Sequence, residues 1–188
     1  MDELPEWMYP PRDEGWFAED LDHLPEAPKH TELIDGVLVF RGRPQTSWHS
    51  QVGGRLTEAL NALAPDGHSV VSGMTVTLDR RNRMESDALV TTADWDPGRT
   101  WFAPAEVPLV VEVVLPESAH RDHGVKLRKY AEAGIPHYWV VENEGWRPVV
   151  HVYELGRAVS YAPAGIFRGV LERPVPFPIT IDLNALVS

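Results

Sequence analysis

Two carboxylates stand inside otherwise apolar segments of this sequence. Asp87 opens the run Ser86-Asp-Ala-Leu-Val90, and Glu112 lies within the run Leu109-Val-Val-Glu-Val113. A carboxylate in a buried strand costs on the order of several kcal/mol unless a cation or hydrogen bonds compensate it. A divalent ion such as Mg²⁺ is a natural compensating cation, because it binds one or two carboxylates and keeps water molecules and substrate phosphates as its other ligands. The alternative for each residue is a carboxylate that ends a strand or pairs with an arginine.

A third candidate group comes from the segment that follows Glu112. Asp122, Lys126 and Tyr130 recur every four residues, so on a helix they share one face. From that face Lys126 can reach a substrate phosphate or an attacking water. The alternative is an ordinary surface ion pair between Asp122 and Lys126, worth a few tenths of a kcal/mol.

Basic side chains form two short clusters that suit contact with phosphates. Arg80, Arg81 and Arg83 form the first, and we expect them to contact nucleic acid, with a solvated surface turn as the alternative. The net charge of −11 argues against a large basic interface. Residues 1–30 carry −7 of that charge, however, and the other 158 residues carry only −4. The charge balance therefore leaves room for a local nucleic-acid contact. The second cluster consists of Arg121, Lys126, Arg128 and Lys129.

The elements that must position these side chains alternate between strand-like and helix-like patterns. Apolar residues at helical spacing predict a helix over 48–63, and a second over 121–133 that ends at Gly134 and Pro136. The strand–helix–strand passage over 107–142 is typical of a βαβ unit, which makes the fold α/β or α+β. Strands are predicted over 69–78, 86–92, 107–115, 137–142 and 149–154, with weaker ones near 158–162 and 168–172.

Shorter signals complete the expected outline. A short helix is predicted around residues 17–24, and Asp35-Gly36 between two β-prone runs predicts a hairpin, since both positions tolerate positive φ. The Arg-rich segment 79–85 is expected to be a turn. The apolar segment 170–186 is the one surface that the sequence offers for self-association.

Length and composition limit the domain organisation. The 188 residues suit one domain, which we place at 16–188 after an acidic, proline-rich arm at 1–15. The chain has no cysteine, so disulfides, thiolate metal sites and cysteine nucleophiles are excluded. No apolar run approaches the roughly 20 residues of a membrane span, and the acidic N-terminus is unlike a signal peptide. A soluble, cytoplasmic protein is expected.

Several of these features also occur together in a known family. The motifs are Glu32-Leu-Ile-Asp-Gly36, His49, Ser86-Asp87, Leu109-Val-Val-Glu-Val113, Asp122-x-x-x-Lys126-x-x-x-Tyr130 and Ala133-Gly-Ile-Pro-His-Tyr-Trp139. In this order they resemble the Uma-type restriction endonucleases of the PD-(D/E)XK nuclease superfamily, over about residues 17–155. The last motif, with its Gly-Ile-Pro-x-Tyr-Trp, is the most specific one.

The resemblance implies a fold and an activity. The fold would be a restriction-endonuclease-like mixed sheet core flanked by helices, α/β (α+β) in class, with extra C-terminal strands. The activity would be hydrolysis of DNA phosphodiester bonds that depends on Mg²⁺ or Mn²⁺. The substrate would be double-stranded DNA and the protein a homodimer, since two active sites related by a two-fold axis match the symmetry of the duplex.

The resemblance also implies roles for particular residues. Asp87 and Glu112 would be metal ligands, and Glu32 a further acid of the catalytic site. Lys126 would be the catalytic lysine, because Val114 occupies the position where the superfamily normally has it. The sequence departs from the family further at Ser86, where a proline is usual, and at Leu115, where a serine often follows. His49, Asp122 and Tyr130 are accessory candidates, and packing or helix capping is the alternative role for His49.

Two other classes of function compete with a metal-dependent endonuclease. A catalytically silent nuclease-fold protein could serve as a protein-interaction module through its acidic surface. A β-rich domain that binds a sugar or nucleotide without hydrolysis is the weaker alternative. Retention of all three acids and the lysine favours the enzyme, whereas the negative charge and Ser86 leave room for the interaction module.

Overall fold

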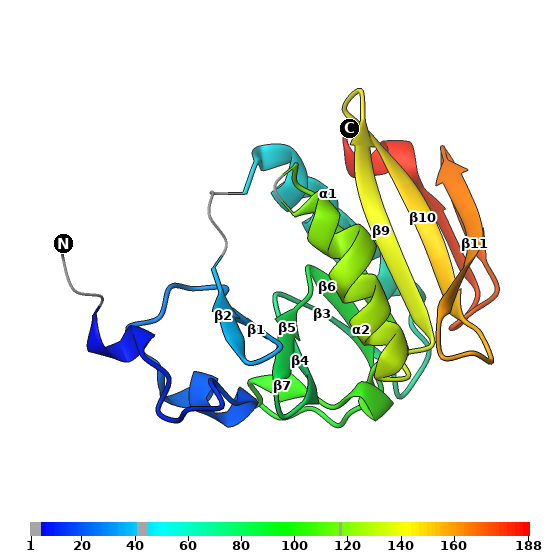
Figure 1. The fold of residues 1–188 in the computed structure, drawn as a ribbon. Coiled ribbons are helices and arrows are strands. Elements are labelled where there is room, and N and C mark those ends of the chain that lie inside the picture. The colour runs from blue at the N-terminus through cyan, green and yellow to red at the C-terminus, as the bar shows by residue number, and fades with distance from the viewer. Residues whose placement is uncertain (1–4, 41–44, 117) are drawn as a thin grey trace.

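The computed structural model describes residues 5–40, 45–116 and 118–188. Its described strands form a six-stranded sheet in the order β11-β10-β9-β8-β6-β3, a five-stranded sheet in the order β2-β1-β5-β4-β7, and the ribbon β12-β13. Figure 1 shows β9, β10 and β11 side by side at one end of the molecule, with the N-terminal segment at the other. The mixed α+β class and the additional C-terminal strands are as expected.

The bounds of the elements are as follows. The six-stranded sheet contains β3 (Ser69–Ser72), β6 (Ala88–Thr91), β8 (Leu109–Val113), β9 (His137–Glu144), β10 (Arg147–Leu155) and β11 (Tyr161–Arg168). The five-stranded sheet contains β1 (Glu32–Ile34), β2 (Val37–Val39), β4 (Thr75–Asp79), β5 (Asn82–Glu85) and β7 (Trp101–Phe102), and the ribbon contains β12 (Val170–Arg173) and β13 (Ile179–Asp182). The helices are α1 (Ser47–Leu63), a π-helix (Arg121–Lys126) that continues into α2 (Leu127–Glu132), and 3-10 helices at Glu6–Met8, Ala18–His23, Pro104–Glu106 and Leu183–Leu186.

The predicted βαβ unit is confirmed. β8 and β9 pair in parallel, with Glu112 opposite Val140, and the helical segment 121–132 lies between them in the chain. All five residues of β8 are buried, as its run of β-branched residues on both alternations predicts. Glu112 therefore sits on a central strand that is covered on both faces.

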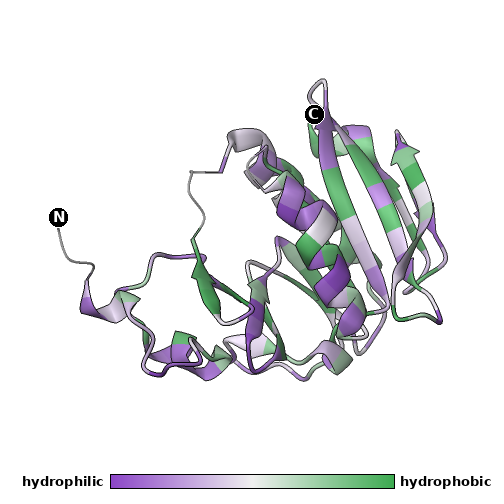
Figure 2. Ribbon diagram, in the orientation of Figure 1, coloured by the Kyte–Doolittle hydropathy of each residue, from purple (hydrophilic) through white to green (hydrophobic). Residues whose placement is uncertain are grey.

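Apolar side chains cover the two faces of the large sheet from different parts of the chain. On one face α1 contributes Val52, Leu56 and Leu60 at helical spacing, packed with residues of the C-terminal segment. On the other face α2 contributes Tyr130, which packs near Tyr138 and Val140 of β9. Figure 2 shows hydrophobic stretches along β9 and β10, whereas the helical segment 121–132 in front of them consists mostly of hydrophilic residues. Glu112, Lys126 and Tyr130 lie on this second face, whereas Asp87 contacts His49 of α1.

The turn that carries Asp35 and Gly36 forms the predicted hairpin. Asp35 has φ 53° and Gly36 has φ 79°, and Ile34 pairs with Val37 across the turn. Positive φ at both central positions matches the right-handed twist of the flanking strands. Asp35 also forms an ion pair of 2.5 Å with the buried Lys129 of α2, a contact that its role as a turn residue did not predict.

Three sequence expectations are wrong in detail. The predicted strand over 69–78 is two strands of different sheets, because Gly73 adopts φ 63° and redirects the chain. The segment 79–85 is a tight turn followed by the fully buried strand β5. Most apolar side chains of 170–186, among them Leu171 and Leu183, pack in the core, and only Val170 and Val175 of its large apolar residues are exposed, so the segment does not offer an extended dimer surface. None of the helices in the described ranges combines the length and apolar character needed to cross a membrane.

Candidate active site

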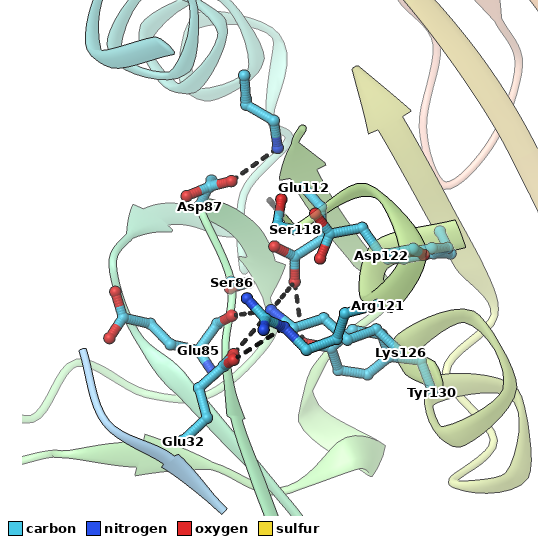
Figure 3. Close-up of polar contacts among 12 residues, drawn as sticks. Glu32, Glu85, Ser86, Asp87, Glu112, Ser118, Arg121, Asp122, Lys126 and Tyr130 are labelled. Atoms are coloured by element: carbon cyan, nitrogen blue, oxygen red, sulfur yellow. Dashed lines mark hydrogen bonds and ion pairs between the residues drawn. The ribbon is translucent and has the colours of Figure 1, made fainter. Parts of the chain in front are cut away.

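Lys126 lies at the centre of a buried cluster of carboxylates. Its Nζ is 2.7 Å from Glu32 Oε1 and 2.9 Å from Glu112 Oε1, and it also donates to the backbone carbonyl of Glu85 at 2.8 Å. The lysine side chain is only 1% exposed. Figure 3 shows Glu32, Glu112 and Lys126 converging from three separate elements. The prediction that Lys126 points its ammonium group at these acids is confirmed.

The three contacts use the full donor capacity of Lys126. An ammonium group has three N–H donors, and each has one acceptor here. In this arrangement Lys126 holds the two carboxylates and supplies positive charge, but it has no donor left for a substrate. Its role in the site is therefore to position and neutralise Glu32 and Glu112.

Local structure explains why these side chains meet. β1 pairs with β5, so the backbone N–H of Glu85 donates to Glu32 Oε1 at 3.0 Å and fixes that carboxylate. The π-helix precedes α2 directly and buries Asp122 as well as Lys126. Such wider turns are rare and occur frequently at functional sites. One turn further on, Tyr130 donates its hydroxyl to Glu112 Oε1 at 3.2 Å.

Asp87 lies in the bend just before β6, next to the strand that carries Glu112. β6 and β8 pair antiparallel, with Ala88 opposite Val111. The backbone N–H of Val113 in β8 donates to Asp87 Oδ2 at 2.7 Å, and the same oxygen lies 3.3 Å from Nε2 of the buried His49 of α1. The charge of Asp87 also acts on Glu112 and contributes to its raised pKa. That the two carboxylates share one metal ion stays a prediction.

Acids outnumber cations in this region, which perturbs their ionisation. Burial raises the pKa of Glu112 well above its usual range; Lys126 opposes that rise, and Asp122, Asp87 and Glu32 add to it. Burial also raises the pKa of Asp122. Burial alone would lower the pKa of Lys126, but the charges of Glu112 and Glu32 outweigh burial and raise it. The cluster thus favours the charged form of Lys126 and disfavours the ionised forms of Glu112 and Asp122.

The raised pKa values predict how the metal-free protein responds to pH. Groups whose folded-state pKa lies above the unfolded value, about 4.3 for Glu and 3.9 for Asp, stabilise the fold fully below that value. That contribution is lost as the pH rises through the folded pKa of Glu112 and Asp122. We therefore compare the free energy of unfolding of Glu112→Gln with that of wild type, measured by urea unfolding at pH 5 and at pH 8. The difference should favour Glu112→Gln more at pH 8 than at pH 5. An equal difference at both pH values would contradict the assignment.

Two contributions to the site were not assigned to it from the sequence, where Arg121 was noted only as a member of the second basic cluster. Arg121 Nε lies 3.7 Å from Glu32 Oε2, and its side chain is 23% exposed, so it is a cation that faces both the acids and the solvent. The backbone of Glu85 supplies one donor and one acceptor to the cluster. The position of Arg121 next to Asp122 could have pointed to it, whereas a backbone contact leaves no signal in residue types.

The three arginines that we expected to contact nucleic acid differ in their exposure to solvent. Arg83 is buried: its guanidinium pairs with Asp22 at 2.9 Å and its Nε donates to Thr75 Oγ1 at 2.9 Å. The expected role of Arg83 in contacting nucleic acid is therefore wrong, because β5 turns its side chain inward. Arg80 and Arg81 are exposed, although Arg80 lies over the Phe17 ring and Arg81 donates to backbone carbonyls. For these two the contact stays a prediction.

The donors present suit a hard divalent cation. Among residues 5–40, 45–116 and 118–188, no group of three or more His, Asp or Glu side chains is arranged to hold a metal ion. Asp87 and Glu112 nevertheless provide two carboxylates whose charges act on each other, with Asp122 and Glu32 nearby. Two carboxylates are sufficient for Mg²⁺, which keeps water and phosphate oxygens as its remaining ligands.

Comparison with known proteins identifies the family. The family model described as "Uma2: Putative restriction endonuclease" matches residues 18–185. The chain belongs to the Uma2 family. Its fold is similar to a crystal structure described as "a putative nuclease belonging to DUF820", from Anabaena variabilis, with a TM-score of 0.71. The two chains are 16% identical, and the match covers 90% of this chain and 96% of the other. No curated protein matches the sequence.

Membership in Uma2 extends the resemblance first seen in the motifs. The match runs through the C-terminal ribbon, past the residues that carried the resemblance. The matched range includes Glu32, Asp87, Glu112 and Lys126. The structural likeness, at its low identity, concerns the fold.

Proposed function

We propose that this Uma2 protein is a metal-dependent endonuclease that hydrolyses phosphodiester bonds of DNA. The observation that carries the proposal is the pair of buried acids on Lys126, Glu32 and Glu112, with Asp87 and Asp122 close enough to act on Glu112. An isolated structural ion pair needs one acid for each cation. Here four acids accompany Lys126 and Arg121, and burial first, then the charges of Asp122, Asp87 and Glu32, raise the pKa of Glu112. A divalent cation would balance the charge.

Each side chain has a proposed role in this chemistry. Asp87 and Glu112 would hold Mg²⁺ or Mn²⁺, which when bound polarises a phosphoryl oxygen and lowers the pKa of a coordinated water. Lys126 fixes Glu32 and Glu112 and adds preorganised positive charge near the reacting phosphate. Glu32 Oε2 has no hydrogen-bond partner among the described residues, so Glu32 is available to accept a proton from the attacking water.

Arg121 is the cation that we assign to the substrate. Unlike Lys126, its side chain is partly exposed, and Nε has no hydrogen-bond partner within the described part of the chain. A guanidinium binds phosphate through paired N–H donors. Asp122 and Tyr130 support the other site residues and have no proposed contact with the substrate. Tyr130 donates a hydrogen bond to Glu112, and Asp122 contributes negative charge that favours the ionised form of Lys126.

The proposed substrate is double-stranded DNA, and the proposed assembly is a homodimer. Cutting both strands requires two active sites, which a two-fold dimer places on the two antiparallel strands. We expect light scattering to give twice the chain mass of 21.1 kDa at micromolar concentration. A mass of one chain would instead indicate a nicking enzyme. Because most apolar side chains of 170–186 pack inside, we expect the dimer surface to lie elsewhere.

Incubation with supercoiled plasmid tests the proposed function. Nicked or linear product is expected with Mg²⁺ or Mn²⁺ and none with EDTA, since the acids need a divalent cation to bind the scissile phosphate. Product that is equally abundant in EDTA would contradict the metal requirement. Intact plasmid under every metal condition, from protein shown to be folded, would favour the silent interaction module.

A further inference from the structure

A pocket of about 240 Å³ opens beside Asp87, away from Lys126. Its titratable lining residues are His30, His49, Glu85 and Asp87, and the remainder is largely small residues such as Ser50 and Gly53. His30 is already engaged, because its Nδ1 lies 2.6 Å from Glu85 Oε1. His49 is the lining residue whose chemistry the proposed function leaves unused.

His49 is held firmly but is poorly satisfied. It lies in the first turn of α1, where its backbone N–H donates to the capping Thr46 Oγ1 at 3.2 Å. The side chain is 4% exposed, and neither ring nitrogen has a hydrogen-bond partner among the described residues. Leaving a buried polar nitrogen without such a partner costs free energy, so each such group in a folded protein calls for an explanation.

The position of His49 relative to Asp87 suggests an explanation for the unsatisfied ring nitrogens. His49 Nε2 lies 3.3 Å from Asp87 Oδ2, close enough for an ion pair but without the orientation of a hydrogen bond. Nitrogen and oxygen ligands about 2.0–2.2 Å from one metal ion, at tetrahedral or octahedral angles, lie roughly 3.0–3.5 Å apart. The observed separation therefore suits two atoms that share a metal ion.

We propose that His49 Nε2 and the Asp87 carboxylate are ligands of one metal ion, and that the site prefers a transition-metal ion such as Mn²⁺ to Mg²⁺. The inference rests on the metal requirement of the proposed function and specifies its ligand and its metal. Mg²⁺ is bound through oxygen and keeps its waters, whereas first-row transition metals accept imidazole nitrogen readily. Water and substrate oxygens fill the positions that the protein does not.

Electron spin-echo spectroscopy of the Mn²⁺-loaded protein tests this ligand directly. An imidazole bound to Mn²⁺ produces nitrogen-14 modulations, and we expect wild type to show them and His49→Gln to lose them. His30→Gln is the matched control, since His30 lines the same pocket but is paired with Glu85. Calorimetric titration should show His49→Gln binding Mn²⁺ about tenfold more weakly or worse, with Mg²⁺ binding changed far less.

The outcomes separate this inference from the proposed function. Mn²⁺ that binds wild type and is lost in Asp87→Ala, yet shows no nitrogen modulation, would overturn the role of His49 and leave the nuclease intact. Modulations that disappear in His30→Gln instead would also overturn it. Absence of Mn²⁺ binding to wild type would overturn this inference, and absence of Mg²⁺ binding as well would overturn the proposed function. The wild-type spectrum decides the matter even if His49→Gln does not fold.

Discussion

Replacing Glu112 with glutamine is expected to abolish metal-dependent cleavage, a loss of at least about three orders of magnitude or 4 kcal/mol in the activation free energy. The amide keeps the shape of the side chain, and its oxygen can still accept from Lys126 and Tyr130. The substitution removes the negative charge of the carboxylate, which the proposed metal ion needs for binding. The measurement is the single-turnover rate on labelled duplex DNA in Mg²⁺ or Mn²⁺.

A matched control separates the charge of Glu112 from charge in general. Glu142 lies on the neighbouring strand β9, and its carboxylate contacts His123 and His151 at the surface. Glu142→Gln should therefore cleave at close to the wild-type rate. Full activity of Glu112→Gln in Mg²⁺ would contradict the proposed metal site, particularly if its fold and its affinity for DNA were unchanged.

Loss of Lys126 is the second large effect. Lys126→Ala should lower turnover by two to three orders of magnitude, about 2.7–4 kcal/mol, because a preorganised positive charge is removed from the site. It should also destabilise the fold by about 3–5 kcal/mol, since Glu32 and Glu112 would remain buried without their cation. Single-turnover cleavage gives the first quantity and urea unfolding the second.

Lys129 provides the control for Lys126. It lies on α2, three residues further along, and is also buried, but its ammonium pairs with Asp35 of the hairpin turn. Lys129→Ala should affect stability and leave turnover nearly unchanged. Lys126→Arg retains the charge and shows whether an unstable alanine variant is the reason for lost activity. Equal turnover of Lys126→Ala and wild type would contradict the proposed role of Lys126 in catalysis.

The site could be predicted from the sequence where strand patterns determine it. Asp87 and Glu112 stand in apolar runs, and the antiparallel pairing of β6 with β8 places those runs side by side. The four-residue spacing of Lys126 and Tyr130 likewise placed both on the face that meets Glu112. These features depend on local periodicity, which is what a single sequence records best.

Other parts could not be predicted because they depend on tertiary contacts. Gly73 looked like one residue in a long strand, yet its positive φ divides two sheets. Arg83 looked like a surface cation, yet Asp22, far away in the sequence, pairs with it in the interior. The engagement of all three Lys126 donors required the backbone carbonyl of Glu85, which any residue type would supply.

Single-turnover cleavage of a labelled DNA duplex by wild type and Asp87→Asn, across a Mn²⁺ titration, tests the central claim most directly. The account predicts that the wild-type rate rises from zero in EDTA and saturates with Mn²⁺. Asp87→Asn, which keeps the acceptor for the Val113 N–H, should fold and yet cleave at least about a hundredfold more slowly at every Mn²⁺ concentration. Equal rates for the two proteins, or wild-type cleavage that EDTA does not stop, would contradict it.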